Sequence, residues 1–441
     1  MTIRSRTIIV VALLLIVAST VLCTRLGSAS LRSWDEAVYA QCAREMVQNG
    51  DWLTIHWNGE KFFQKPPLFI WSTAILYKLF GVSEFTSRLA SALCGIGVVI
   101  LTFFMTRLFF DLIPALLTSL MLLTSPAFFI VARWGMTDVM LTFFILLALY
   151  AYLKCRDPRY WYLVGTALGL AILTKGAAAL PAVFVIAGAA IWTRAKSRHV
   201  WLGLFLFILI ASSWHVAMIY IHGMQFLKEY VGVQVVTRAV RTLDAETYSS
   251  LYYVAMMGFP LILFPLGLLR LRQKRDIPSV VVVFALLIIA ICIVVKTKHA
   301  WYILPALPAI STLIAPGNGF KIRPYLFCLL IGLNVALLWR VNRAVKSDMP
   351  AHENLVRLAR QASQDEGPLG VYPGIYFGPE VRFYSNRRLC GGGDHTMAIL
   401  AQCSPTHIIA WRSDQPSLST KYALTPVAES GEFLYFRVDA Y

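Results

Sequence analysis

The run TIIVVALLLIVASTVLC, residues 7–23, holds no charged side chain over seventeen positions. A helix needs about 17 to 25 apolar residues to cross a hydrocarbon core of roughly 30 Å. Similar runs recur almost to residue 341, and 58% of the 441 residues are hydrophobic while only 14% are charged. These features predict a mainly α-helical, multi-pass membrane protein, in which residues 7–23 form an uncleaved first span rather than a cleaved signal peptide.

Eleven runs are candidates for transmembrane helices. They lie near residues 7–23, 89–110, 112–131, 136–153, 158–174, 177–193, 200–221, 251–269, 278–295, 300–315 and 324–341. We therefore expect a transmembrane domain over 1–341 with two long loops on one face, 24–88 and 222–250. Within the first loop, the fourteen residues 67–80 are too few to cross and favour a helix lying in the interface.

The net charge of +17 reflects topology rather than nucleic-acid binding, because lysine and arginine concentrate in loops on the cytoplasmic side of membrane proteins. With the N-terminus inside, the short outer loops hold only Arg133, Lys175, Lys296 and Lys298. The inner loops hold fifteen basic residues: Arg4, Arg6, Arg107, Lys154, Arg156, Arg159, Arg194, Lys196, Arg198, Arg270, Arg272, Lys274, Arg275, Lys321 and Arg323. An odd number of spans then places the C-terminal tail outside.

The tail, residues 342–441, is expected to be a small soluble α/β domain. Alternating apolar residues predict strands in GPLGVYPG (367–374), THIIAWR (406–412) and GEFLYFRV (431–438), and a helix in DHTMAILAQ (394–402). Two of the eight cysteines, Cys390 and Cys403, fall in this tail. An oxidising compartment permits a disulfide between them, but their spacing does not establish one.

Ionisable residues gather at the outer ends of the spans, where they are costly and tend to be paired or functional. They come from separate stretches: Asp35 and Glu36 in SWDEAVY, Lys65 in QKPPL, Asp138 in MTDVML, Lys175 in LTKG, and Lys298 in KTKHAWYILP. Each lysine alone could simply reach towards the headgroups, and Asp138 could cap a helix. Two acids and several cations around one cavity would instead suit a lipid-linked anionic ligand, with lysines for a phosphate and a carboxylate for proton transfer.

The proline pair Pro66-Pro67 explains the setting of Lys65. Proline is tolerated at the start of a helix, and it forces the preceding residue out of helical geometry. Lys65 is therefore expected in an extended segment at the mouth of the interfacial helix, at the level of a lipid phosphate.

These motifs resemble those of the GT-C membrane glycosyltransferases, most closely the 4-amino-4-deoxy-L-arabinose transferases and the related protein O-mannosyltransferases. The matching patterns are DExxY (35–39), NG-x-x-x-F-x-KPPL-x-x-W (58–71), FG-x-x-E-F-x-x-RL (80–89), MTDVML, LTKG and K-x-x-x-YILPALPA (from 298). Together they cover roughly residues 30 to 315.

The resemblance implies a transferase on the periplasmic face of a bacterial inner membrane, with a polyprenyl-phosphate sugar donor (undecaprenyl in bacteria) and a lipid, glycan or protein acceptor. Asp35 matches the catalytic carboxylate. The substrate-binding positions are Glu36, Tyr39, Lys65, Asp138, Lys175, Arg238, Lys298 and Tyr302.

This chain departs from the aminoarabinose branch at two positions that could ligate a metal in that branch. Gln64 stands where glutamate is usual, and Gln234-Val235 stand where the branch has Glu-His. Glutamine and valine are poor zinc ligands, so we expect no metal and no other cofactor.

Two other classes of function are compatible with a polytopic chain. A secondary transporter or flippase of an anionic lipid-linked substrate would usually show internal repeats and charges near the midplane, and the sequence shows neither. A non-catalytic scaffold for envelope assembly would leave the clustered acids without a role.

Overall fold

The apolar runs that the computed structural model describes form helices. The structure describes residues 3–237, 278–295, 299–316, 328–338, 350–372, 378–390, 400 and 403–439, without the side chains of 234–237 and 300. Contacts divide the chain into two compact units. Unit 1 comprises residues 1–26, 63–72 and 88–341, and unit 2 comprises residues 27–62, 73–87 and 342–441.

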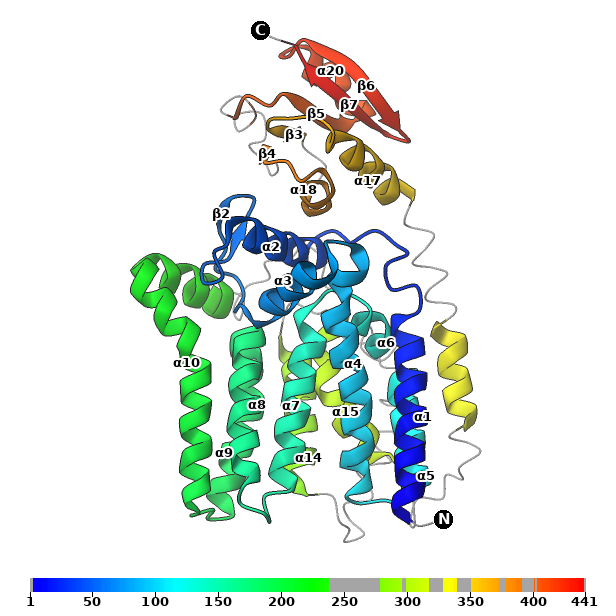
Figure 1. The fold of residues 1–441 in the computed structure, drawn as a ribbon, viewed down its shortest axis with the longest axis vertical. Helices are drawn as coiled ribbons and strands as arrows, with labels where there is room; N and C mark the ends of the chain where they lie inside the picture. The colour runs from blue at the N-terminus through cyan, green and yellow to red at the C-terminus, as the bar shows by residue number, and fades with distance from the viewer. Residues whose placement is uncertain are drawn as a thin grey trace. The chain divides into compact units, whose positions relative to one another are not determined.

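Unit 1 is a bundle of apolar helices (Figure 1). Its elements are α1 (Ile3–Cys23), α4 (Glu84–Arg107), α5 (Leu112–Leu123), α6 (Pro126–Ala132), α7 (Thr137–Leu153), α8 (Tyr160–Lys175), η1 (Gly176–Ala179), α9 (Leu180–Trp192), α10 (Arg198–Phe226), η2 (Leu227–Thr237), α14 (Ser279–Val294), η4 (Ala300–Ala306) and α15 (Leu307–Leu313). Residues 328–338 form one more apolar helix.

Four helical stretches among the described residues are long and apolar enough to cross a membrane. The number becomes five if α5 and α6, which meet at 66°, are taken as one span. The run at 251–269 lies outside the described residues, so the expected total of about eleven spans stays a prediction. The runs at 158–174 and 177–193 correspond to α8 and α9, and Gly176 between them has φ 56° and ψ −124°, which ends α8.

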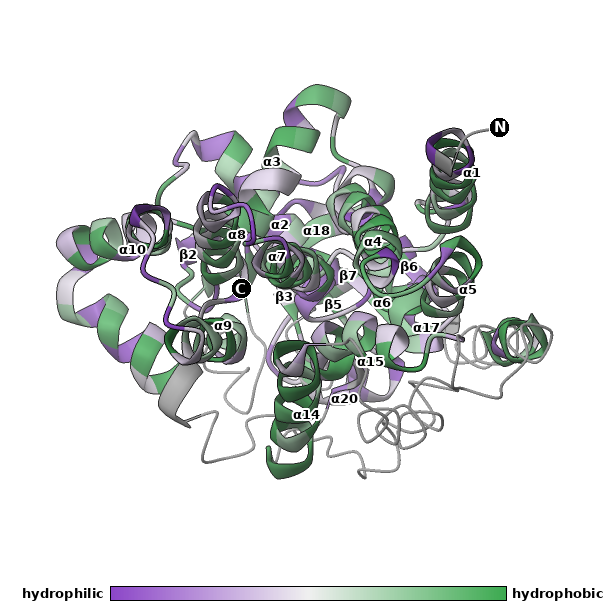
Figure 2. Cartoon of the chain, turned by 90° about the horizontal axis from the view of Figure 1, so that it is seen from below, coloured by the Kyte–Doolittle hydropathy of each residue, from purple (hydrophilic) through white to green (hydrophobic). Residues whose placement is uncertain are grey.

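Large apolar side chains face outwards from unit 1. Ile191, Trp192 and Trp201 are 77%, 88% and 68% exposed. Figure 2, viewed along the bundle, shows the same hydrophobic colouring on many of its helices. Such an exterior fits a lipid solvent, in which every backbone polar group is bonded within its own helix.

Helix α8 packs against both α7 and α10. The crossing with α10 is close because Gly165 lies against the carbonyl of Gly203, where a Cβ on either glycine would collide with backbone. Small residues at helix contacts allow this approach in membranes, where no hydrophobic effect drives helices together. The expected outer loop at 222–250 is helical at its start, since α10 bends at Gly223 (φ 56°) and continues into η2.

Unit 2 joins the first loop to the C-terminal tail. The loop contributes α2 (Asp35–Asn49), β1 (His56–Trp57), β2 (Glu60–Lys61) and most of α3 (Leu68–Phe80). The expected helix at 67–80 is thus confirmed, and the carbonyl of Pro67 accepts the N–H of Trp71 in its first turn. The tail contributes α17 (Pro350–Ala362), β3 (Leu369–Val371), α18 (Pro379–Ser385), β4 (Leu389–Cys390), β5 (His407–Trp411), η5 (Arg412–Asp414), α20 (Gln415–Ser419), β6 (Leu424–Ser430) and β7 (Phe433–Val438).

The tail strands form one sheet in the order β4-β3-β5-β7-β6. The first three are parallel and the last two antiparallel. The strands expected around 369–371, 407–411 and 433–438 are confirmed, whereas most of the helix expected at 394–402 lies outside the described residues. Cys390 and Cys403 form a disulfide, with Cα atoms 5.9 Å apart.

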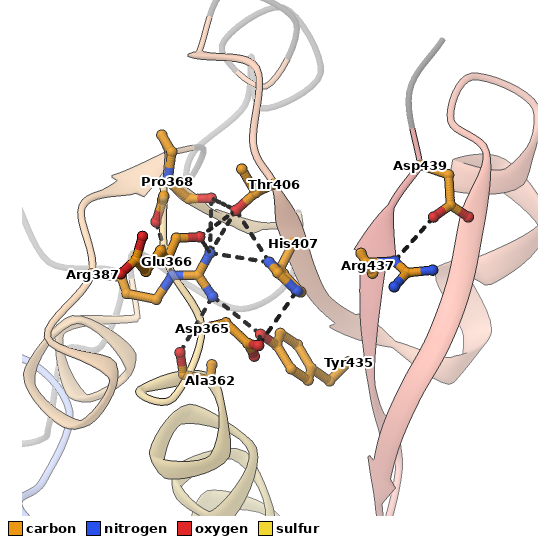
Figure 3. Close-up of polar contacts among 11 residues, drawn as sticks. Ala362, Asp365, Glu366, Pro368, Arg387, Thr406, His407, Tyr435, Arg437 and Asp439 are labelled. Atoms are coloured by element: carbon orange, nitrogen blue, oxygen red, sulfur yellow. Dashed lines mark hydrogen bonds and ion pairs between the residues drawn. The ribbon is translucent and has the colours of Figure 1, made fainter.

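Arg387 holds the loops at one end of this sheet (Figure 3). The residue is 6% exposed. Its guanidinium donates to the carbonyls of Glu366 and Gly367 at 2.8 Å, to Thr406 Oγ1 at 2.7 Å and to Tyr435 Oη at 3.1 Å. A buried cation that satisfies several carbonyls in this way rigidifies the loops around it.

Candidate functional site

An ion pair links two of the ionisable residues at helix ends in unit 1. Lys175 Nζ lies 2.6 Å from Asp138 Oδ1, and the two side chains are 11% and 3% exposed. Asp138 is in the first turn of α7, and Lys175 is in the last turn of α8. Each charge therefore also complements the dipole of its own helix.

Tyr302, from η4, lies over the same lysine. Its ring centroid is 5.5 Å from Lys175 Nζ. Next to it, His299 stacks on Trp301 with ring centroids 4.5 Å apart. Three stretches singled out in the sequence, at 138, 175 and 302, thus meet at one place in unit 1.

The LTKG and KPP motifs also meet, at Gly176. A Cβ on this residue would collide with Tyr230 Oη and come within 3.7 Å of Pro66 Cγ. The positive φ of 56° independently favours glycine. Lys65, adjacent to Pro66, is 8% exposed.

An aromatic cluster from α10 and η2 surrounds this contact, and the sequence analysis did not identify it. His215 Nε2 lies 3.0 Å from Tyr230 Oη. The ring of Phe226 stacks on that of Tyr230 with centroids 5.1 Å apart, and it meets the ring of Phe63 edge-on with centroids 5.4 Å apart. Phe63 lies two residues before Lys65, and its ring centroid is 5.1 Å from that of His222. The positions 215, 222, 226 and 230 follow helical spacing, so the sequence could have indicated that they share one helix face. The same spacing is, however, typical of an ordinary buried helix face.

Unit 2 carries the other predicted residues. Asp35 opens α2 and is half-buried. No side chain or backbone group in the described part of the chain bonds its carboxylate. Its neighbour Glu36 is 3% exposed and accepts the N–H of Arg32 at 2.8 Å, while Tyr39 is 1% exposed. The carboxylate of Asp35 thus has no hydrogen-bond partner among the described residues, whereas that of Glu36 supports the turn before α2.

Trp34, directly before Asp35, is in an unusual conformation. Its φ of 69° and ψ of −134° lie in a region that residues with side chains rarely adopt, at a cost on the order of 1–3 kcal/mol. Backbone outliers of this kind cluster at functional sites, where the surrounding structure over-determines them.

The Asn58-Gly59 pair has a structural role. Both residues have positive φ, 55° and 82°, in the tight turn between β1 and β2. The Asn58 side chain bonds both main-chain groups of Leu389 at 2.8 and 3.1 Å. Glu45 accepts the N–H groups of Asn58 and Gly59 at 2.9 and 3.0 Å and pairs with Arg382 at 2.8 Å.

The remaining predicted residues are not described together. Arg238 and Lys298 lie outside the described residues. Gln64 is exposed, and its amide is a poor ligand for a divalent transition metal, which prefers imidazole, thiolate and carboxylate groups.

Comparisons with known proteins add an independent line of evidence. The profile of the family described as "Dolichyl-phosphate-mannose-protein mannosyltransferase" matches residues 64–216. An uncharacterised protein of Aquifex aeolicus is 31% identical over 294 residues, which cover 65% of this chain and 67% of that protein. The "Undecaprenyl phosphate-alpha-4-amino-4-deoxy-L-arabinose arabinosyl transferase 1" of Pseudomonas fluorescens is 29% identical over 73% of this chain and 64% of its own length. The chain thus spans about two thirds of the length of these relatives.

Solved structures show the same fold. The crystal structure of ArnT from Cupriavidus metallidurans bound to undecaprenyl phosphate superposes with a TM-score of 0.79 at 20% identity and covers 97% of both chains. The archaeal oligosaccharyltransferase AglB from Archaeoglobus fulgidus superposes with a TM-score of 0.60 at 12% identity and covers 98% of this chain and 74% of that one. The likeness extends over both units described above.

Proposed function

The chain belongs to the GT-C membrane glycosyltransferases of the aminoarabinose-transferase and protein O-mannosyltransferase type, and from this premise we propose that it moves a sugar from a polyprenyl-phosphate donor to an envelope acceptor. The acceptor is a lipid A-like lipid, a glycan or a protein, and the active face is the periplasmic side of a bacterial inner membrane. The clustering of Asp138, Lys175 and Tyr302 at the ends of apolar helices, beside the KPP segment, is the observation that carries the proposal.

In this reaction the acceptor attacks the anomeric carbon, and the bond from that carbon to the phosphate oxygen breaks with inversion. The polyprenyl phosphate leaves with the electron pair, and cations fixed beside the leaving group stabilise its growing charge. Lys175 is already neutralised by Asp138. The phosphate contacts are therefore assigned to Lys65, Arg238 and Lys298, with Tyr302 nearby.

Asp35 is assigned the proton transfer. A hydroxyl acceptor must lose its proton as the new bond forms, and a half-buried carboxylate without a partner among the described residues suits a general base. If the acceptor is a phosphate, which is already deprotonated, Asp35 orients it instead. In either case the role differs from that of the buried Glu36.

A deletion strain provides the test in cells. Mass spectrometry of its extracted lipids should show the loss of one sugar modification, restored by wild type but not by Asp35→Asn. Asp111→Asn is the matched control, because Asp111 is exposed at the start of α5 and its side chain bonds no capping N–H. A normal set of envelope lipids together with altered uptake would instead indicate a transporter.

Donor-concentration curves in nanodiscs test Lys65. Lys65→Ala should weaken donor use far more than membrane insertion, and Lys65→Arg should restore only part because a guanidinium binds with a different geometry. Pro67→Ala should do less harm, since it loosens the placement without removing the charge. The exposed Lys61 gives the control Lys61→Ala. Equal curves for all variants would remove Lys65 from phosphate binding.

The wild-type transfer rate should survive exhaustive chelation, because no metal is expected in the reaction. Loss of transfer on chelation, with recovery on adding zinc or magnesium, would contradict this expectation.

A further inference from the structure

The C-terminal tail holds the segment that leads into Asp35. Leu31 is completely buried, and both of its main-chain groups bond side chains of the tail. Its N–H donates to Tyr384 Oη at 2.7 Å, and its carbonyl accepts from His352 Nε2 at 2.9 Å. The partners are 353 and 321 residues away in the chain.

Contacts on both sides of Leu31 strengthen this attachment. Ser30 Oγ donates to Glu353 Oε2 at 2.9 Å, and Tyr384 Oη donates onward to Glu84 Oε1 at 3.1 Å. Helix α18 also packs against α2, where Arg382 forms its buried ion pair with Glu45. The tail therefore fixes the segment before α2 and the helix itself.

This attachment accounts for the backbone of Trp34. A strained residue persists only where its neighbours are held on both sides. The tail bonds hold residues 30–31, and the Glu36–Arg32 bond with the first turn of α2 holds the other side. Loss of the tail bonds would remove one of these two restraints on Trp34, which directly precedes Asp35.

We propose that the C-terminal domain acts as a positioning element for Asp35, with His352 and Tyr384 as the positioning residues. The inference rests on the proposed transfer reaction and assigns the tail a role in it. Loss of either bond leaves a buried main-chain group of Leu31 unsatisfied, so the segment should loosen without any change at the donor phosphate site.

The test compares Tyr384→Phe and His352→Leu with Tyr435→Phe in the full-length protein. Tyr435→Phe removes another buried hydroxyl of the same domain, one that bonds Asp365 and Arg387 rather than Leu31. The first two variants should lower kcat by roughly ten- to a hundredfold, as small misplacements of a reacting group do. KM for the donor should stay within about twofold, because the groups assigned to the phosphate are unchanged. His352→Gln, which keeps an N–H donor, should recover part of the rate.

Hydrogen–deuterium exchange supplies a readout independent of activity. Exchange of peptides covering residues 30–36 should rise in Tyr384→Phe and His352→Leu and stay at the wild-type level in Tyr435→Phe. Three results would overturn the inference: unchanged exchange, faster exchange without a loss of kcat, or equal kcat for Tyr384→Phe and Tyr435→Phe while Asp35→Asn abolishes transfer.

Failure of the proposed function is seen separately. It would appear as an inactive wild type or as an active Asp35→Asn variant.

Discussion

At the scale of single residues, the Asp138–Lys175 pair is both a structural contact and part of the candidate site. Removing one partner leaves the other charge buried and unpaired, which typically costs about 3–5 kcal/mol. We therefore expect Lys175→Met and Asp138→Asn each to lower the apparent melting temperature clearly in detergent.

The double variant Asp138→Asn/Lys175→Met separates the two roles. With no charge left unpaired, its melting temperature should return most of the way to the wild-type value. Transfer should stay lost if the pair also serves the reaction. Full recovery of transfer in the double variant would show that the pair is structural only. If the two single losses in melting temperature simply add in the double variant, the two charges do not stabilise each other.

The sequence singles out Asp138 and Lys175 but does not show that the two side chains contact each other. Asp138 and Lys175 stand out as ionisable residues at the ends of apolar runs, but nothing local shows that they neutralise each other. The positive φ of Trp34 was unpredictable for the same reason, because it is imposed by distant contacts rather than by residue type. The roles assigned to Asp35, Lys65, Arg238 and Lys298 stay predictions.

At the scale of elements, α18 contains an acid whose burial has a measurable consequence. Glu380 is 4% exposed, and its Oε2 has no hydrogen-bond partner in the described part of the chain. Burial raises its pKa above the usual value for glutamate, against the opposing effects of its own backbone N–H, His352 and Ser33. A carboxyl with a raised pKa in the folded state lowers stability above its unfolded pKa, and this cost disappears as the carboxyl becomes protonated.

We expect Glu380→Gln to melt higher than wild type at about pH 7.5, with the difference shrinking towards about pH 5. The amide keeps an acceptor for Ser33 and the backbone while removing the buried charge. Apparent melting temperatures of the full-length protein across this range provide the measurement. A difference that is constant or grows on acidification would contradict the raised pKa.

Helices were predicted with uneven success. The apolar runs and the helix after Pro67 follow directly from hydrophobicity and proline placement. Helix α18 was not predicted, because it spans only seven residues and its burial depends on α2 and α17. The sequence analysis also missed α17, which spans thirteen residues. The helical start of 222–250 was also missed, since its aromatic residues lie among polar ones.

At the scale of the whole molecule, the distribution of lysine and arginine predicts which ends of the helices face the cytoplasm. Alkaline phosphatase fused after Tyr441 should be active in cells, and the same enzyme fused after Lys196 should be inactive. Fluorescent-protein fusions at the two positions should give the opposite pattern. Activity at Lys196 would reverse the orientation and place the candidate site on the cytoplasmic side.

The fold class could be predicted from the sequence at this scale. The segments that make up each compact unit could not. A chain with 58% hydrophobic residues in repeated runs must be a helical membrane protein. That the first loop and the tail form one compact unit depends on bonds such as Leu31–Tyr384, and no local pattern encodes a contact across 353 residues.

Because unit 2 combines the first loop with the tail, its parts are synthesised at different times. At about 5–20 residues per second, a ribosome needs roughly 20 to 70 s to go from Leu31 to Tyr384. Throughout that time the segment before Asp35 lacks the partners that hold it, even though the intervening helices are being inserted. A nascent or truncated chain thus carries the segment with Asp35 without its support, and that support forms only after His352 and Tyr384 have been synthesised and folded into unit 2.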